Sequence, residues 1–166
     1  MKRMLRLALG ILVLAGPALA QDYPKGEFSA SYSYLRLGFT DGANQQGGSV
    51  SIAGNLNRWF GIAGDFGGYH AAGLDTFTFL AGPRITARNS NVVHPFAQFL
   101  VGGAHVTGFS SVTPFAISAG GGIDVPGPVG LRPQVDYIAM RANGSTVNTL
   151  RVSVGLVFRF GGKSPQ

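Results

Sequence analysis

The sequence predicts an all-β protein, an eight-stranded antiparallel up-and-down transmembrane β-barrel. Three observations lead to this fold class. Charged residues make up only 12% of the 166 residues and hydrophobic residues 45%, whereas an ordinary soluble domain carries roughly 25% charged residues. Apolar and polar residues alternate along most of the chain. After residue 20 no apolar run is long enough for a transmembrane helix, whereas strands that cross a bilayer need apolar residues only at every second position.

Residues 1–20 are predicted to be a cleaved secretory signal peptide. Basic residues precede a short apolar run, and Ala18-Leu19-Ala20 supplies the small residues of a cleavage site. We expect cleavage after Ala20, which leaves residues 21–166 as one outer-membrane β-barrel domain. Three of the 13 basic residues leave with the signal peptide, so the formal net charge of +6 gives little reason to expect a nucleic-acid partner.

The clearest strand pattern covers residues 148–160. Its even-numbered residues from Leu150 to Phe160 are all apolar, and most of the residues between them are polar or Gly. This segment is longer than an ordinary globular strand and suits a tilted strand that crosses a bilayer. The first strand, at about 27–34, repeats the pattern, because aromatic residues and Ala alternate there with Glu27 and three serines.

Six further segments alternate in the same way and are bounded by turn residues. They are predicted at about residues 48–56, 60–69, 76–85, 95–105, 115–125 and 130–140. The segment 95–105 is the least regular, because Phe96 and Leu100 share a face with Gln98. An even number of antiparallel strands in a chain of this length is typical of the smallest outer-membrane barrels.

Two groups of connections are expected between these strands. Short turns near Asn57-Arg58 and at 126–128 would face the periplasm. Connections at the other end are expected at residues 38–47, 70–75, 106–113 and 141–147.

Aromatic residues near the strand ends are typical of the two membrane interfaces. They are Trp59, Phe60, Tyr137, Phe158 and Phe160 toward one rim, and Tyr32, Tyr34 and Tyr69 toward the other. The alternative is a soluble periplasmic ligand-binding barrel with its apolar face turned inward. Such a barrel would have very few Lys or Glu on its surface, which is unusual for a soluble protein.

Several short motifs in the second half of the chain resemble the outer-membrane-protein-A-type β-barrel domain. They are Gly120-Gly121-Gly122-Ile123-Asp124, Arg132, Asp136-Tyr137 and Gly155-Leu156-Val157-Phe158-Arg159-Phe160. The resemblance implies a monomer in the cell outer membrane, in contact with its lipids and lipopolysaccharide, with a structural, adhesive or narrow-pore role. It also implies that Leu156, Phe158 and Phe160 form the strand recognised by the barrel assembly machinery, although six residues follow Phe160.

Charged residues collect on the face opposite the apolar one, where they would point into the lumen. They are Glu27, Asp65, Asp124 and Asp136 together with Arg84, Arg132, Arg151 and Arg159. The lumen of an eight-stranded barrel is only wide enough for side chains to fill, so acids and bases are expected to pair there. This charge ladder is interpreted as a polar plug, and a gate or ion path is the alternative.

Hairpin symmetry suggests which of these groups pair, because residues equidistant from a turn lie opposite each other. This symmetry predicts the pairs Asp136–Arg151, Asp124–Arg132 and Asp65–Arg84. Barrel closure is expected to bring Glu27 and Arg159 to the same periplasmic end.

A lipid A-modifying enzyme of the deacylase type is the alternative function. Such an enzyme would need a His that activates a Ser, and a His-x-Ser pair on one strand would place both on the same face. The closest arrangement to this pair is His105-Val106-Thr107, and neither His70 nor His94 has a Ser two positions later. The absence of Cys excludes thiolate chemistry. No spacing suggests a metal or cofactor site, so none is expected.

Overall fold

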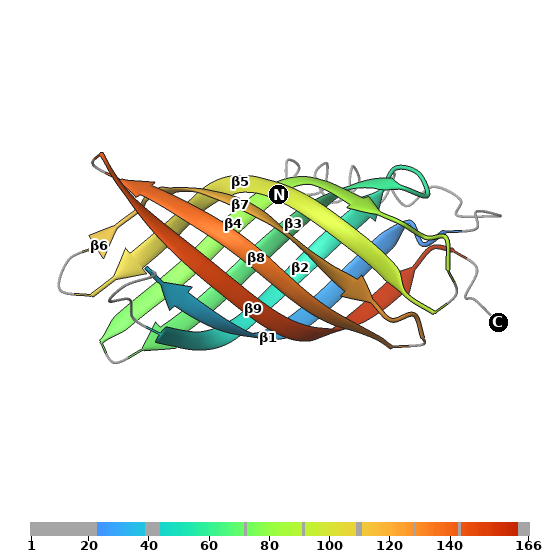
Figure 1. The fold of residues 1–166 in the computed structure, drawn as a ribbon, viewed down its shortest axis with the longest axis horizontal. Coiled ribbons are helices and arrows are strands. Elements are labelled where there is room, and N and C mark those ends of the chain that lie inside the picture. Colours follow the sequence, from blue (N-terminus) through green and yellow to red (C-terminus); the bar gives the residue numbers. More distant parts are fainter. Residues whose placement is uncertain are drawn as a thin grey trace, which may run out of the picture.

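The computed structural model describes residues 23–38, 44–71, 73–90, 92–108, 111–127, 129–142 and 144–162. The predicted signal peptide lies outside the described residues. Figure 1 shows strands that run obliquely along the molecule. The strands are β1 (Gly26–Leu37), β2 (Asn44–Asn55), β3 (Phe60–Ala71), β4 (Leu74–Thr86), β5 (His94–Thr107), β6 (Ser111–Val112), β7 (Phe115–Asp124), β8 (Gly130–Ala142) and β9 (Ser145–Phe160).

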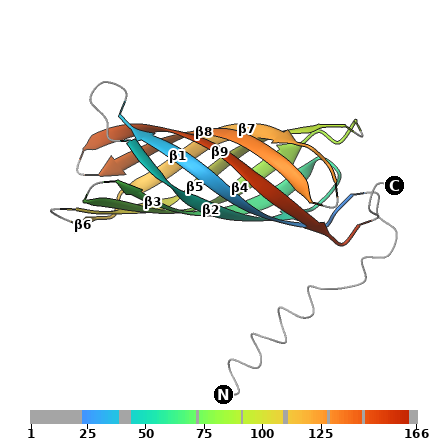
Figure 2. The ribbon, with the colours of Figure 1, turned by 90° about the horizontal axis from the view of Figure 1, so that it is seen from below.

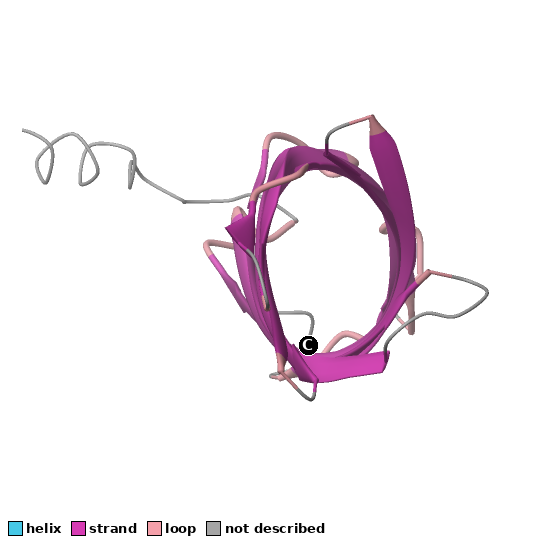
Figure 3. Ribbon diagram, turned by 90° about the vertical axis from the view of Figure 1, so that its left-hand side faces the viewer, coloured by secondary structure: helices cyan, strands magenta, loops and turns pink. Residues whose placement is uncertain are grey.

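The eight long strands close into a barrel. Each is antiparallel to its neighbours, with β5 followed around the wall by β7, and the pairing of β1 with β9 closes the ring. Figure 2 shows β1 beside β9, and Figure 3 shows the ring seen end-on. All eight predicted strands are confirmed, and most extend a few residues beyond their predicted ends. The described parts of the chain contain no helix, and therefore no helix that is long and apolar enough to cross a membrane.

The two-residue strand β6 was not predicted. It pairs with β5 in the same register as β7 does, since both Val106↔Val112 and Gly103↔Phe115 are opposite one another. It is therefore the outer continuation of β7, interrupted at Pro114, which has no backbone N–H to donate. The Pro114 carbonyl still accepts a hydrogen bond from the Ala104 N–H at 3.0 Å.

The two ends of the barrel differ. We call the end with Gly26, Phe160 and the turns 56–59, 87–93 and 125–129 the terminal end. We call the other the hairpin end.

Two hairpin-end connections are tighter than predicted, because strand pairing continues to Ala71↔Leu74 and Ala142↔Ser145. Gly73 and Gly144 lie in these connections with φ of 79° and 81°, a backbone conformation that residues with a side chain rarely adopt. The turn 87–93 falls outside the predicted set.

Apolar side chains cover the outer wall. This fulfils the expectation from the alternating pattern, and it is the reverse of what a soluble barrel requires. The exposed large apolar residues include Phe28, Tyr32, Ile52, Phe66, Phe77, Leu131, Val154 and Phe158. A wall of this composition suits contact with lipid acyl chains.

The lumen is not polar throughout. Toward the hairpin end, buried apolar side chains pack together inside the barrel. They include Leu35, Leu80, Leu100, Ile138 and Met140. An interior that is filled by side chains needs close packing rather than polarity, so apolar residues satisfy it as well as polar ones do.

Candidate functional site

The terminal half of the lumen contains six charged side chains in contact with each other. We call this group, which comprises Glu27, Arg84, Arg88, Asp124, Arg132 and Arg159, the terminal-end cluster. Glu27 lies at its centre. Its carboxylate accepts hydrogen bonds from Arg132 Nη2 and Arg88 Nη2, both at 2.7 Å. Asn55 Nδ2 donates to the same carboxylate at 3.1 Å, and Arg84 Nη1 lies 3.7 Å from it.

Asp124 is the second carboxylate of this cluster. Arg132 binds it in a bidentate manner, with Nε donating to Oδ1 at 2.5 Å and Nη2 donating to Oδ2 at 2.7 Å. Arg159 Nη2 lies 3.2 Å from Asp124 Oδ2. Bidentate pairing fixes the orientation of the guanidinium as well as its position, so Arg132 links both carboxylates rigidly.

The ring of Phe96 lies in the same layer of the lumen. The guanidinium carbons of Arg84 and Arg132 each lie 4.8 Å from its centroid. Phe96 is buried, so these cation–π contacts are shielded from water and are stronger than exposed ones. Phe96 is an aromatic residue on the polar, inward face of β5, and there it interacts with two of the buried cations.

A second group of charges lies further from the termini. We call Asp65, Asp136 and Arg151 the mid-barrel cluster. Arg151 Nη1 donates to Asp65 at 2.6 Å and Nε donates to Asp136 at 2.9 Å, while Nη2 lies 2.8 Å from Asp136. Tyr69 Oη accepts a further hydrogen bond from Arg151 Nη1 at 3.0 Å. This Tyr69 is buried inside the barrel, so its predicted place at an interface on the outer wall is wrong.

Gln98 connects the two clusters. Its Oε1 accepts hydrogen bonds from Arg84 Nε at 3.1 Å and Nη2 at 2.7 Å, and its Nε2 donates to Asp136 at 3.0 Å. The terminal-end cluster contains four guanidinium groups and two carboxylates, whereas the mid-barrel cluster contains one guanidinium group and two carboxylates. The two clusters therefore carry opposite net charge. Gln98 lies between them with its amide oxygen toward the guanidinium of Arg84 and its NH2 group toward the carboxylate of Asp136.

The structure brings together two of the three predicted pairs. Asp136 lies opposite Arg151 in the β8–β9 register, and Asp124 contacts Arg132 as described above. The predicted pair Asp65–Arg84 is wrong. The β3–β4 hairpin turns directly after Ala71, so Asp65 lies opposite Leu80. Its ion pair is with Arg151, from across the lumen.

The structure also places the other residues of the predicted charge ladder and of the predicted assembly strand. Glu27 lies opposite Arg159 in the β1–β9 register, as expected from closure, but the ion pair of Arg159 is with Asp124. The four carboxylates, Arg84, Arg132 and Arg151 are no more than 2% exposed. Leu156, Phe158 and Phe160 all point outward from β9.

Gln98, Phe96 and Arg88 contact the charges of the two clusters and are missing from the predicted set. Gln98 and Phe96 alternate correctly with the outward residues of β5, so their position on the inward face was the available signal. Arg88 gave no such signal, because it lies in the turn 87–93 and reaches Glu27 from outside any strand.

The hairpin end carries a separate group of polar side chains. His105 Nδ1 lies 2.9 Å from Thr113 Oγ1, and its Nε2 lies 3.2 Å from Ser111 Oγ. A search for His and Ser on one strand misses this arrangement, because the residues are on opposite sides of a hairpin. Nearby on β3 and β4, His70 Nδ1 lies 2.5 Å from Asp75 Oδ1. The described residues include no group of three or more acidic or His side chains that could hold a metal ion.

The fold is that of small bacterial outer-membrane barrels. The chain is similar to Neisserial surface protein A (NspA), with a TM-score of 0.67 and 15% identity over 84% of this chain and all of that one. It is similar to the attachment invasion locus protein Ail of Yersinia pestis, with a TM-score of 0.53 and 17% identity over 83% of this chain and all of that one. A third similar structure is the N-terminal β-barrel domain of Pseudomonas aeruginosa OprF, with a TM-score of 0.52 and 15% identity over 80% of this chain and 97% of that one. No protein-family model matches the chain, and no curated protein sequence does.

Proposed function

We propose that this chain is an outer-membrane β-barrel with a plugged lumen, which serves a structural role and presents its hairpin end for attachment. The observation that carries the proposal is the filling of the lumen. Two linked charge clusters occupy its terminal half and middle, and apolar side chains fill the part nearer the hairpin end. A path for ions would have to break several buried ion pairs, and removing one partner of such a pair typically costs about 3–5 kcal/mol. The plug therefore favours a structural role over a pore.

The export route follows from the predicted signal peptide. After cleavage behind Ala20, the barrel assembly machinery would recognise β9 through Leu156, Phe158 and Phe160, whose side chains face outward. The terminal end would then face the periplasm and the hairpin end the exterior. The apolar wall would contact outer-membrane lipids, and we propose that the barrel is a monomer.

An adhesive role would depend on the hairpin end. The printed name of Ail refers to attachment and invasion, and the shared fold makes attachment the role to test first here. Arg36 and Arg141, which are exposed close to the hairpin-end termini of β1 and β8, are candidates for contact with lipopolysaccharide phosphates.

The proposal is tested by expressing the full chain in a Gram-negative cell. We expect the protein in the outer-membrane fraction, with an N-terminus at Gln21 and faster gel migration before boiling than after. Recovery of the chain from the periplasm in buffer without detergent would contradict the proposal. Binding of the expressing cells to immobilised host matrix, compared with cells that carry an empty vector, tests the adhesive part.

The arrangement of Ser111, His105 and Thr113 supports a second candidate, a lipid A-modifying hydrolase. His105 would act as the base for Ser111, with Thr113 orienting the imidazole ring. Both hydrogen bonds of His105 are solvent-exposed, so burial does not help to activate the Ser111 hydroxyl, and the structural role is favoured. A change in the mass of lipid A that depends on expression, and that Ser111→Ala abolishes, would support the enzyme.

A further inference from the structure

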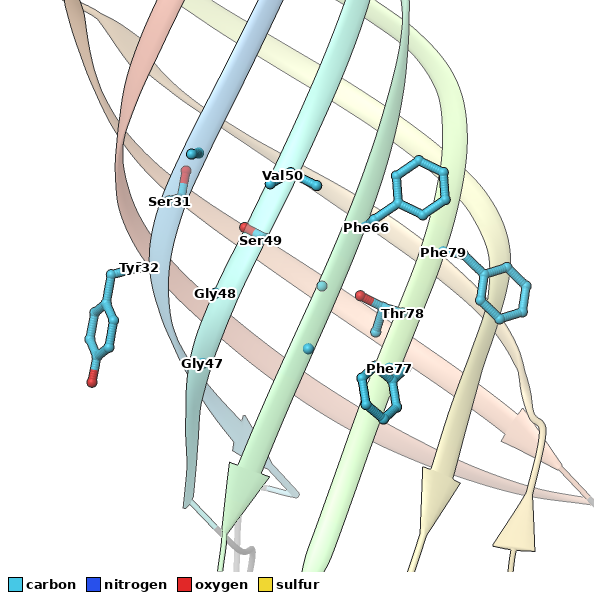
Figure 4. A pocket seen from close by; sticks show the side chains of 13 residues that line it. Ser31, Tyr32, Gly47, Gly48, Ser49, Val50, Phe66, Phe77, Thr78 and Phe79 are labelled. Atoms are coloured by element: carbon cyan, nitrogen blue, oxygen red, sulfur yellow. The ribbon is translucent and has the colours of Figure 1, made fainter.

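The outer wall of the barrel is hollowed over β1 to β4. This outer groove has a volume of about 890 Å³ and is lined mainly by apolar atoms and backbone. Its lining includes Tyr32, Gly48, Val50, Phe66 and Phe77. Figure 4 shows Tyr32 on one side of the groove and Phe77 on the other, with Gly48 between them.

Two glycines form the floor of the groove. Tyr32 lies opposite Gly48, Gly48 opposite Gly68, and Gly68 opposite Phe77, so one row across four strands reads aromatic, Gly, Gly, aromatic. Neither glycine has a positive φ. A Cβ at Gly48 would lie 3.5 Å from its nearest neighbour, the Ser31 carbonyl oxygen, and one at Gly68 would lie 3.4 Å from the Phe77 ring. The backbone therefore does not require Gly at these positions, and the missing side chains leave space outside the wall.

The row next to this floor, on the hairpin side, is polar. It consists of Tyr34, Gln46, His70 and Asp75, which lie opposite one another in that order. Tyr32 Oη, from the wall of the groove, donates to Gln46 Oε1 at 2.6 Å. His70 and Asp75 contact each other and are both exposed. One row further out, β1 carries the exposed Arg36.

We propose that the outer groove seats an acyl chain of lipopolysaccharide, with the sugars of its lipid A headgroup at the row Gln46, His70 and Asp75. The proposal rests on the proposed function, which places the hairpin end in the outer leaflet. The groove is continuous with the apolar wall, so its occupant in a membrane is a hydrocarbon chain. Amide, imidazole and carboxylate groups suit the hydroxyl and amide groups of an acylated amino sugar.

The charges at the mouth favour a glycolipid over a phospholipid. A phospholipid carries its phosphate directly above its chains, where the Asp75 carboxylate would repel it. In lipid A the sugars separate the acyl chains from the phosphates, and Arg36 lies further out, where a phosphate would be. A second copy of this chain fits less well, because a recess floored by glycines is not complementary to itself in a symmetric contact.

The test fills the groove without disturbing the wall. Gly48→Leu and Gly68→Leu each place a side chain on the floor, where the structure has room for the Cβ. Gly54→Leu is the matched control, since Gly54 is exposed on the same strand, has no atom within 4 Å of its Cβ position and does not line the groove. Each full-length protein is folded in detergent micelles, mixed with equal amounts of lipid A and phosphatidylethanolamine, and weighed intact by native mass spectrometry.

We expect the wild type and Gly54→Leu to retain one lipid A molecule. Each floor variant should bind it at least about tenfold more weakly, the factor expected for losing contact with roughly two methylene groups. His70→Ala should reduce the preference for lipid A over phosphatidylethanolamine. Equal retention by all variants, equal retention of the two lipids by the wild type, or a dimer in place of a lipid adduct would each overturn the proposal. Failure to fold in detergent would instead contradict the proposed function, so the two failures are distinguishable.

Discussion

Removing Arg151 tests the importance of the mid-barrel cluster, because this single cation serves two buried carboxylates. Arg151→Met keeps much of the side-chain volume but leaves Asp65 and Asp136 without the guanidinium that lies 2.6 and 2.8 Å from them. Asp136 keeps hydrogen bonds from Gln98 and Gln134, whereas Asp65 loses its ion pair with Arg151. We expect the free energy of unfolding to fall by about 3–5 kcal/mol, as when one partner of a buried pair is removed.

A compensated variant separates this effect from loss of packing. Arg151→Met combined with Asp65→Asn and Asp136→Asn removes the charges together, and an ion cluster replaced as a whole is often neutral for stability. The triple variant should therefore recover at least about 2 kcal/mol of the loss. Asp75→Asn is the control, since its pair with His70 is exposed and should contribute no more than about 1 kcal/mol.

The assay is equilibrium unfolding in urea with the protein in lipid vesicles. Trp59 is the only Trp of the sequence and lies exposed at the terminal end, so its fluorescence should report loss of the barrel. An Arg151→Met variant as stable as the wild type would refute the reasoning, and so would a triple variant no more stable than the single one.

Three further predictions concern the lumen and the wall. Phe96→Leu should lower the free energy of unfolding by about 2–4 kcal/mol in the same assay, because two shielded cation–π contacts are lost together with the packing of the ring. A loss smaller than that caused by Asp75→Asn would contradict this prediction. Gln98→Leu should lower the free energy of unfolding by about 1–3 kcal/mol, since Arg84 then lacks the acceptor of two buried hydrogen bonds, and a Gln98→Leu protein as stable as the wild type would contradict it. Gly122→Ala should impair folding as judged by the heat-sensitive gel shift, because its Cβ would lie 2.2 Å from the Pro133 carbonyl oxygen, whereas Gly54→Ala should fold like the wild type.

The barrel itself could be predicted from the sequence because its geometry imposes a simple rule. Successive side chains of a strand point to opposite faces, and a lipid-facing wall needs apolar residues along one face only. The pair Asp136–Arg151 could be predicted for a related reason, since the β8–β9 pairing, which continues to Ala142↔Ser145, fixes which residues lie opposite one another.

Other parts of the lumen could not be predicted in this way. The contact between Arg151 and Asp65 joins β9 to β3 across the lumen, and strand register gives no information about such contacts. Arg88 lies in a turn. Leu35 and Ile138 are apolar residues on the inward face, where the rule that apolar means outward fails, because a narrow lumen filled by side chains does not need to be polar.

The central claim is that the lumen is plugged, and the most direct test of it is ion conductance across planar bilayers that contain the wild-type protein. Heat-sensitive gel migration and protection from protease, measured on vesicles from the same preparation, show that the barrel is folded and inserted. The plugged lumen predicts no current steps above those of the lipid alone, both for the wild type and for Asp136→Asn, which keeps the apolar layer and the terminal-end cluster. Uniform current steps from the inserted wild-type barrel, proportional to voltage, would contradict it.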